Sequence, residues 1–147
     1  MKKNLTLSVA VVVLTCVSYS VGADESEAPK SRIGPGKAVL EAVEANGIRL
    51  SEKAVQNLNL RFTPIATDEA AKIPVTALVK FQDFLAVYRK RDGWFKMVEV
   101  EPRIQNGTAL IASKDLKLGD EIVVENASLL RVVDLDVWGP EADACAD

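Results

Sequence analysis

The residues with the greatest capacity for chemistry or binding gather around one predicted hairpin. Aromatic and basic side chains alternate there, and Trp, Tyr and Arg are the residue types that dominate protein-binding hot spots. A basic and aromatic hairpin of this kind is typical of a docking surface. The alternative is that alternate aromatic side chains fill the core and the basic residues form its rim. The candidate partner-binding residues are Phe84, Tyr88, Arg89, Arg91, Trp94 and Phe95.

The residue types that most enzymes need are scarce. The chain has no histidine, which removes the commonest general base and the commonest metal ligand. Cys145 has no imidazole to activate it, and Met97 alone cannot form a thioether cluster for a soft metal. The glycines stand singly at turns, with no phosphate-binding loop. We therefore expect a protein that is not an enzyme and has no cofactor and no metal.

Carboxylates are plentiful but fall at outward strand positions or near the ends of the chain. The formal net charge of −3 argues against nucleic acid as a partner, which would favour a basic face. Acidic residues that converged at one end of a barrel would instead favour a cation or small ligand. The residues for that alternative are Glu99, Glu101, Asp120 and Glu121.

The N-terminus is typical of an export signal. Lys2 and Lys3 precede an apolar run from Leu5 to Val17, and Val21-Gly22-Ala23 offers small residues for a signal peptidase. We expect cleavage after Ala23 and no membrane insertion afterwards. A retained anchor is one alternative, although the run is shorter than the roughly 20 residues of a membrane span. A lipoprotein attached at Cys16 is another.

The rest of the chain divides into three parts. Residues 24–38 are polar, with two prolines and two glycines, and are predicted to form a flexible leader. Residues 39–138 are predicted to form one β-domain, and residues 139–147 a loose acidic tail. After cleavage only Cys145 would remain, so no internal disulfide is expected and the domain must depend on its apolar core.

Within the domain the apolar residues mostly alternate with polar ones. Val98 and Val100 alternate with glutamates, and residues 133–137 alternate in the same way, which predicts two half-buried strands. Asp92-Gly93 predicts a tight hairpin turn between strands 85–90 and 94–100. Asn106-Gly107 predicts a second turn, and Gly119-Asp120 a reversal before strand 121–125.

One helix is predicted after Ser51, a good N-cap, and a strand over 60–65 follows it. A surface loop is expected over 66–72. The fold class is thus mainly β: a small antiparallel β-barrel or β-roll of six to eight strands with one or two short helices. Closure into a barrel would remove exposed strand edges.

Several segments resemble the membrane fusion proteins, the periplasmic adaptors of bacterial efflux pumps. The resemblance covers about residues 39–137 and implies the membrane-proximal domain of that family, with the intervening domains missing and the ends joined through 66–72. The segments that carry it are Ile48-Arg49-Leu50-Ser51, Leu58-Asn59-Leu60-Arg61, 73–79, 88–93, 96–100, 116–120 and 122–124.

This resemblance implies a non-catalytic accessory module in the periplasm of a Gram-negative bacterium. Its partner would be an inner-membrane RND-type efflux pump or a full-length adaptor. Without the helical hairpin and the lipoyl domain, the family's bridging role does not transfer. Two alternatives stay open: a free-standing binder of a small ligand or cation, and an inhibitor or chaperone-like partner of another envelope protein.

Overall fold

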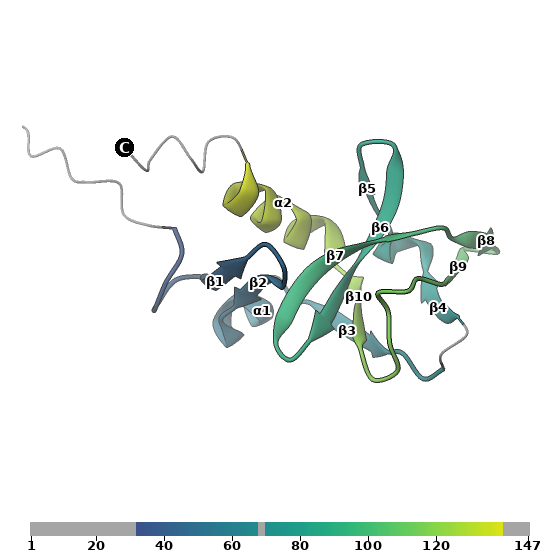
Figure 1. Cartoon of the computed structure of the whole chain (residues 1–147), viewed down its shortest axis with the longest axis horizontal. Helices are drawn as coiled ribbons and strands as arrows, with labels where there is room; N and C mark the ends of the chain where they lie inside the picture. Colours follow the sequence, from purple (N-terminus) through teal and green to yellow (C-terminus); the bar gives the residue numbers. More distant parts are fainter. Residues whose placement is uncertain (1–31, 68–69, 140–147) are drawn as a thin grey trace, which may run out of the picture.

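The computed structural model describes residues 32–67 and 70–139, which form ten short strands, two α-helices and one 3₁₀ turn (Figure 1). The strands are β1 (Val39–Val43), β2 (Gly47–Leu50), β3 (Arg61–Pro64), β4 (Ala71–Pro74), β5 (Val79–Phe81), β6 (Phe84–Arg91), β7 (Trp94–Val100), β8 (Arg103–Gln105), β9 (Thr108–Ile111) and β10 (Glu121–Glu125). The helices are α1 (Glu52–Asn57), η1 (Val75–Ala77) and α2 (Ala127–Trp138).

Some predictions fall outside the described residues. The signal segment 1–23, residues 24–31 of the predicted leader and residues 140–147 of the predicted tail belong to this group. The described end of the leader contacts the domain, because Ile33 bridges Val39 in parallel and Gly34 N–H donates to the Val39 carbonyl at 3.0 Å. Among the described residues, neither helix is long and apolar enough to span a membrane.

The larger sheet is built around the hairpin of β6 and β7. Its strand order is β1-β2-β7-β6-β10-β3, with β5 also paired to β6, and every pairing is antiparallel. The β6–β7 turn uses Asp92 and Gly93 at φ 52° and 81°, the left-handed backbone that such turns require. The sequence-based prediction of this hairpin is confirmed.

A second sheet, β4-β9-β8, is separate from the first. The predicted Asn106-Gly107 turn joins β8 to β9, and the predicted loop after Ala66 ends where β4 begins at Ala71. The prediction of a closed or nearly closed barrel is wrong, because β1 and β3 lie at the two ends of the larger sheet and do not pair with each other. The sheets instead form layers with short edge strands, which also limits edge pairing.

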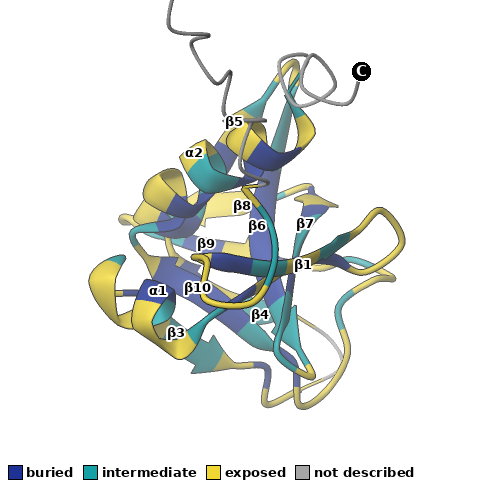
Figure 2. Ribbon diagram, turned by 90° about the vertical axis from the view of Figure 1, so that its left-hand side faces the viewer, coloured by how far each residue is buried: buried dark blue, intermediate teal, exposed yellow. Residues whose placement is uncertain are grey.

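Two apolar cores lie on opposite faces of β6, β7 and β10. Successive strand residues point to opposite faces, so Tyr88, Phe95 and Val123 enter the first core, while Val87, Val98 and Ile122 enter the second. Helices α1 and α2 and the β1–β2 hairpin cover the first core. The β4-β9-β8 sheet and η1 cover the second. Figure 2 shows the buried central strands between these layers.

The predicted strand over 133–137 is wrong, because this segment is the second half of helix α2. Over its full length, α2 buries Ala127, Leu130, Asp134 and Val137, a spacing of three and four residues that fits one helix face. Leu135, predicted to point inward, is 49% exposed. A window of five residues shows the alternation but is too short to show the helical period.

The predicted helix after Ser51 is confirmed as α1. The Ser51 hydroxyl accepts a hydrogen bond from Ala54 N–H at 3.2 Å, which satisfies a backbone donor that the helix leaves free. Ala54 is buried against the first core and Val55 packs beside it. The strand predicted over 60–65 is also present, as β3, and it pairs with β10.

Candidate functional site

The structure separates the six candidate residues of the hairpin into buried and accessible groups. Tyr88 is fully buried and Phe95 is 2% exposed, both in the first core. Arg89 is also buried. Phe84, Arg91 and Trp94 are half-buried, and Phe84 additionally packs against Phe81, with 5.0 Å between ring centroids. A partner can therefore reach only these last three without opening the domain.

Tyr88 is part of a polar network beneath α2. Its hydroxyl donates to Asp134 Oδ2 at 2.8 Å, and Arg131 Nη1 donates to the same oxygen at 3.0 Å. Burial, followed by the charge and hydrogen bond of Asp134, raises the pKa of Tyr88, so the phenol stays protonated. The Arg131 guanidinium also lies over Phe81, 4.4 Å from the ring centroid. The network attaches the helix to the sheet.

A row of charged and aromatic residues crosses the larger sheet at the hairpin turn. Glu41 pairs with Arg49, Arg49 with Trp94, and Trp94 with Arg91, while Arg91 contacts Asp120 just before β10. Directly paired residues of adjacent strands project from the same face. We call this row, Glu41–Arg49–Trp94–Arg91–Asp120, the cross-strand row. It places one aromatic ring between two arginines.

The ends of the cross-strand row are ion pairs of different kinds. Arg91 Nε and Nη2 donate to Asp120 Oδ1 and Oδ2, both at 2.6 Å, a bidentate geometry. Burial would raise the pKa of Asp120, but hydrogen bonds from Arg91 and from Lys117 N–H, with the nearby positive charges, hold it below its ordinary value. At the other end, Arg49 donates to Glu41 at 3.0 Å in an exposed pair.

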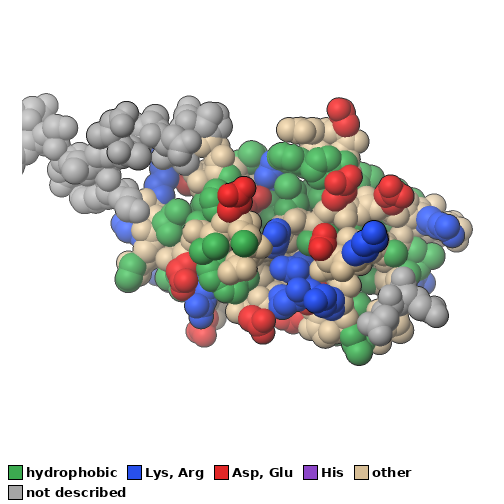
Figure 3. Space-filling model, viewed as in Figure 1, with side chains coloured by type: hydrophobic (Ala, Val, Ile, Leu, Met, Phe, Trp, Pro, Cys, Tyr) green, Lys and Arg blue, Asp and Glu red, His purple; other side chains and the backbone are tan. Residues whose placement is uncertain are grey.

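Arg89 lies two residues before Arg91 in β6, opposite Lys96. Its Nη1 donates to the Asp115 carbonyl at 3.3 Å, whereas its buried Nε has no hydrogen-bond partner among the described residues. Burial and the charge of Arg91 lower the pKa of Arg89. Lys96 Nζ donates to the Ala45 carbonyl at 2.6 Å. Figure 3 shows basic side chains gathered near the middle of one face, over the β6–β7 hairpin.

The four acidic residues of the cation hypothesis do not converge. Glu99 pairs with Ala86 in β6, whereas Glu121 pairs with Lys90 four residues further along the same strand. Glu121 and Asp120 are each engaged by a basic side chain, Lys90 and Arg91. Within residues 32–67 and 70–139, no group of three or more carboxyl or thiol side chains is placed to hold a metal ion.

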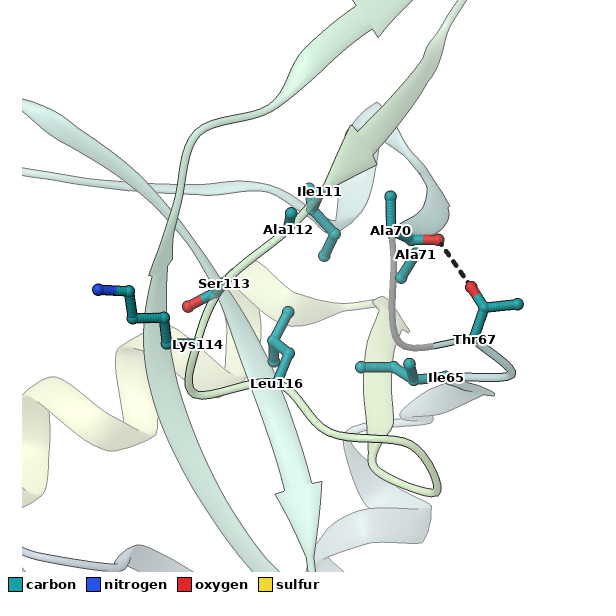
Figure 4. Close-up of a pocket in the computed structure, with 9 residues that line it drawn as sticks. All are labelled: Ile65, Thr67, Ala70, Ala71, Ile111, Ala112, Ser113, Lys114 and Leu116. Carbon is teal, nitrogen blue, oxygen red and sulfur yellow. Dashed lines mark hydrogen bonds between the residues drawn. The ribbon is translucent and has the colours of Figure 1, made fainter.

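A cavity of about 450 Å³ opens beside the second sheet (Figure 4). Ile65, Ile111 and Leu116 turn toward its interior, while the Ser113 hydroxyl and the Lys114 ammonium point away from it. The Thr67 hydroxyl donates to the Ala70 carbonyl at 3.3 Å. The cavity therefore presents apolar surface with few groups to orient a ligand.

The hairpin is predictable from the sequence, but the row that crosses it is not. Arg49 lies 45 residues before Trp94 in the numbering, and only the pairing of β2 with β7 brings them together. No local pattern gives that register. The signal in the sequence is Arg49 itself, a cationic residue within the otherwise apolar strand Gly47–Leu50.

The fold and this surface define a small layered β-domain with a basic and aromatic hairpin end. Comparison with protein-family models, with curated proteins and with solved structures found no match for the chain. The resemblance to membrane fusion proteins therefore stays a prediction based on its motifs.

Proposed function

We propose that this protein is a non-catalytic binding module of the bacterial periplasm that docks on a protein partner through the cross-strand row. The resemblance of its segments to membrane-proximal domains makes an RND-type inner-membrane efflux pump, or a full-length adaptor, the proposed partner. The chain would act as an accessory to that transport system.

The observation that carries the proposal is the position of Trp94 between Arg49 and Arg91 on paired strands. Hot spots combine aromatic and arginine side chains, and a rigid arrangement reduces the entropy lost on binding. Here the strand ladder fixes the backbone spacing, and Asp120 fixes the Arg91 guanidinium in a bidentate pair. The exposed Arg49 is the more adaptable of the two cations.

The chemistry of the row also favours an acidic partner surface. The pair between Arg49 and Glu41 is about half exposed on both sides, and pairs of that kind contribute only about 0–1 kcal/mol. Arg49 can therefore exchange Glu41 for a carboxylate of the partner at little cost. Charge complementarity of this sort mainly sets association rate and selectivity.

The test is recovery of the partner from crosslinked membranes of the host by the tagged mature chain. Wild type is expected to recover the pump or adaptor, and Trp94→Ala and Arg49→Glu to lose most of it. Lys72→Glu makes the same charge change at an exposed position of β4 in the second sheet, so it is the matched control. Thermal unfolding of each variant verifies that the fold is kept.

The outcomes separate the partner from the site. Equal loss with Arg49→Glu and Lys72→Glu would show a general charge effect and remove the cross-strand row from the proposal. If wild type recovers neither pump nor adaptor, the efflux association is wrong. Recovery of a different envelope protein would favour the inhibitor or chaperone-like alternative.

A further inference from the structure

We propose that a second cavity, between α1 and the β6–β7 turn, binds a small apolar molecule that carries one negative charge. Its volume is about 540 Å³, within the range of roughly 300–1,000 Å³ that is usual for small-ligand sites. We call it the α1 cavity. The proposal does not depend on the partner proposed above.

The interior of the α1 cavity is apolar. Leu50 and Phe95 contribute buried side chains, and Leu40 and Val55 contribute half-buried ones. Leu50 and Phe95 belong to the first core, and Val55 lies on α1, whose start Ser51 fixes. These walls are held by packing and by a helix cap, so the cavity exists before any ligand enters.

Two cations line the same cavity from the strands on either side of β7. Lys90 pairs with Phe95 across β6 and β7, so its side chain projects from the same face as the Phe95 ring. Arg49 contributes from β2 and adjoins Gly93 at the turn. Glu52 is the one acid among the lining residues. Arg49 pairs with Trp94 and so projects from the opposite face, which leaves Lys90 as the cation on the same face as the Phe95 ring.

Lys90 is placed to exchange its present partner for a ligand. Its Nζ contacts Glu121 at 2.7 Å in a partly exposed pair and lies 4.4 Å from the centroid of the Phe62 ring. The ring contact holds the side chain over the first core, while a partly exposed ion pair contributes little stability. An incoming carboxylate can therefore take the place of Glu121. The single ammonium group of Lys90 matches a monoanion.

The cavity beside the second sheet lacks this combination. Its serine and lysine point away from the apolar interior, so no charge is presented to a ligand there. Of these two cavities, only the α1 cavity joins an apolar interior to a cation that shares its face. Charge complementarity therefore assigns the apolar anion to the α1 cavity.

The experiment measures binding of decanoate and of neutral decanol to the wild-type chain by calorimetry. Decanoate is expected to bind one site with the higher affinity. Lys90→Met keeps an apolar stem and removes the charge. It is expected to weaken decanoate binding up to about fivefold, as loss of one partly exposed ion pair would, and to leave decanol binding unchanged. Val55→Trp fills the cavity and is expected to abolish binding of both.

A matched variant tests the competing surface. Val132 is 63% exposed on α2, beside other exposed apolar residues of that helix. Loss of decanoate binding in Val132→Asp, with binding kept in Val55→Trp, would place the ligand on α2 and overturn the proposal. Absence of binding to wild type, or equal weakening of decanoate and decanol by Lys90→Met, would overturn it too. If Val55→Trp does not fold, the Lys90→Met comparison decides.

The design also separates this proposal from the docking function. Val55→Trp leaves Arg49, Trp94 and Arg91 in place, so it is expected to recover the membrane partner as wild type does. Arg49→Glu is expected to lose the partner whether or not decanoate binds. Failure of one proposal therefore leaves the other standing.

Discussion

At the scale of single residues, Tyr88 shows how one hydroxyl joins helix α2 to the sheet. The Tyr88 ring fills the first core, and its hydroxyl supplies one of the two hydrogen bonds that side chains donate to Asp134 Oδ2. Asp134 is 8% exposed, so water cannot readily replace a lost donor. A hydrogen bond to a charged, buried group contributes about 1–3 kcal/mol, and without the Tyr88 hydroxyl Asp134 keeps only the bond from Arg131.

Tyr88→Phe is therefore expected to lower the free energy of unfolding by about 1–3 kcal/mol and to leave the fold intact. Urea denaturation measures the change. Asp134→Asn alone, and the double variant with Tyr88→Phe, complete a double-mutant cycle that isolates the coupling between the two side chains. A coupling energy near zero would contradict the proposed role of the network.

Asp120 makes the stability of the fold depend on pH. Its pKa in the folded protein lies below the ordinary value of 3.8, so the unfolded chain binds a proton more readily. The stabilisation is thus complete above about pH 4 and is lost as the pH falls through the folded pKa. Asp120→Asn is expected to be less stable than wild type at neutral pH, with the difference shrinking at low pH. Urea unfolding across this range is the measurement, and a difference independent of pH would contradict it.

At the scale of elements, Gly47 controls how closely β2 approaches β7. Its φ is +94°, and a Cβ there would lie 2.1 Å from the Phe95 carbonyl oxygen. Gly119 has a similar φ of +87°, but nothing lies within 4 Å of its Cβ position. The two glycines share the backbone requirement and differ in the space around them.

Gly119→Ala is expected to cost about 1–2 kcal/mol, the usual penalty of a left-handed backbone. Gly47→Ala adds a backbone clash, and overpacking of that kind costs about another 1–3 kcal/mol. Chemical denaturation of both variants gives the comparison. If the two substitutions prove equally destabilising, β2 does not approach β7 as closely as the structure places it.

The elements also show which features local sequence can predict. Asp92-Gly93 and Ser51 act on their immediate neighbours, so the hairpin and the start of α1 follow from a few residues. Helix α2 was missed because Val133, Leu135 and Val137 alternate with acidic residues, and five residues are too few to show the helical period. The cross-strand row and the open ends of the larger sheet depend on which strands pair. Pairing between distant segments is decided by packing of the whole domain, and therefore no short pattern reveals it.

At the scale of the whole molecule, the two cores share one wall. Val87 and Tyr88 are neighbours in β6, yet they belong to different cores. Loosening either core removes support from the same strand, and small domains with such shared elements usually unfold in one transition. We expect the layers to unfold together rather than one after the other.

Variants placed in each core test this cooperativity. Leu130 is fully buried in the first core, and Leu130→Ala is expected to lower the free energy of unfolding by about 2–5 kcal/mol. Its neighbour Leu129 is 48% exposed, so Leu129→Ala should change that free energy by no more than about 0.5 kcal/mol. Val87→Ala perturbs the second core.

With Trp138→Phe in the background, Trp94 fluorescence reports on the hairpin and far-UV circular dichroism reports on the whole backbone. Each core variant should shift both signals to the same new unfolding midpoint, because β6 cannot stay ordered when either of its faces loses its cover. Separate unfolding midpoints would mean that the two layers are independent folding units.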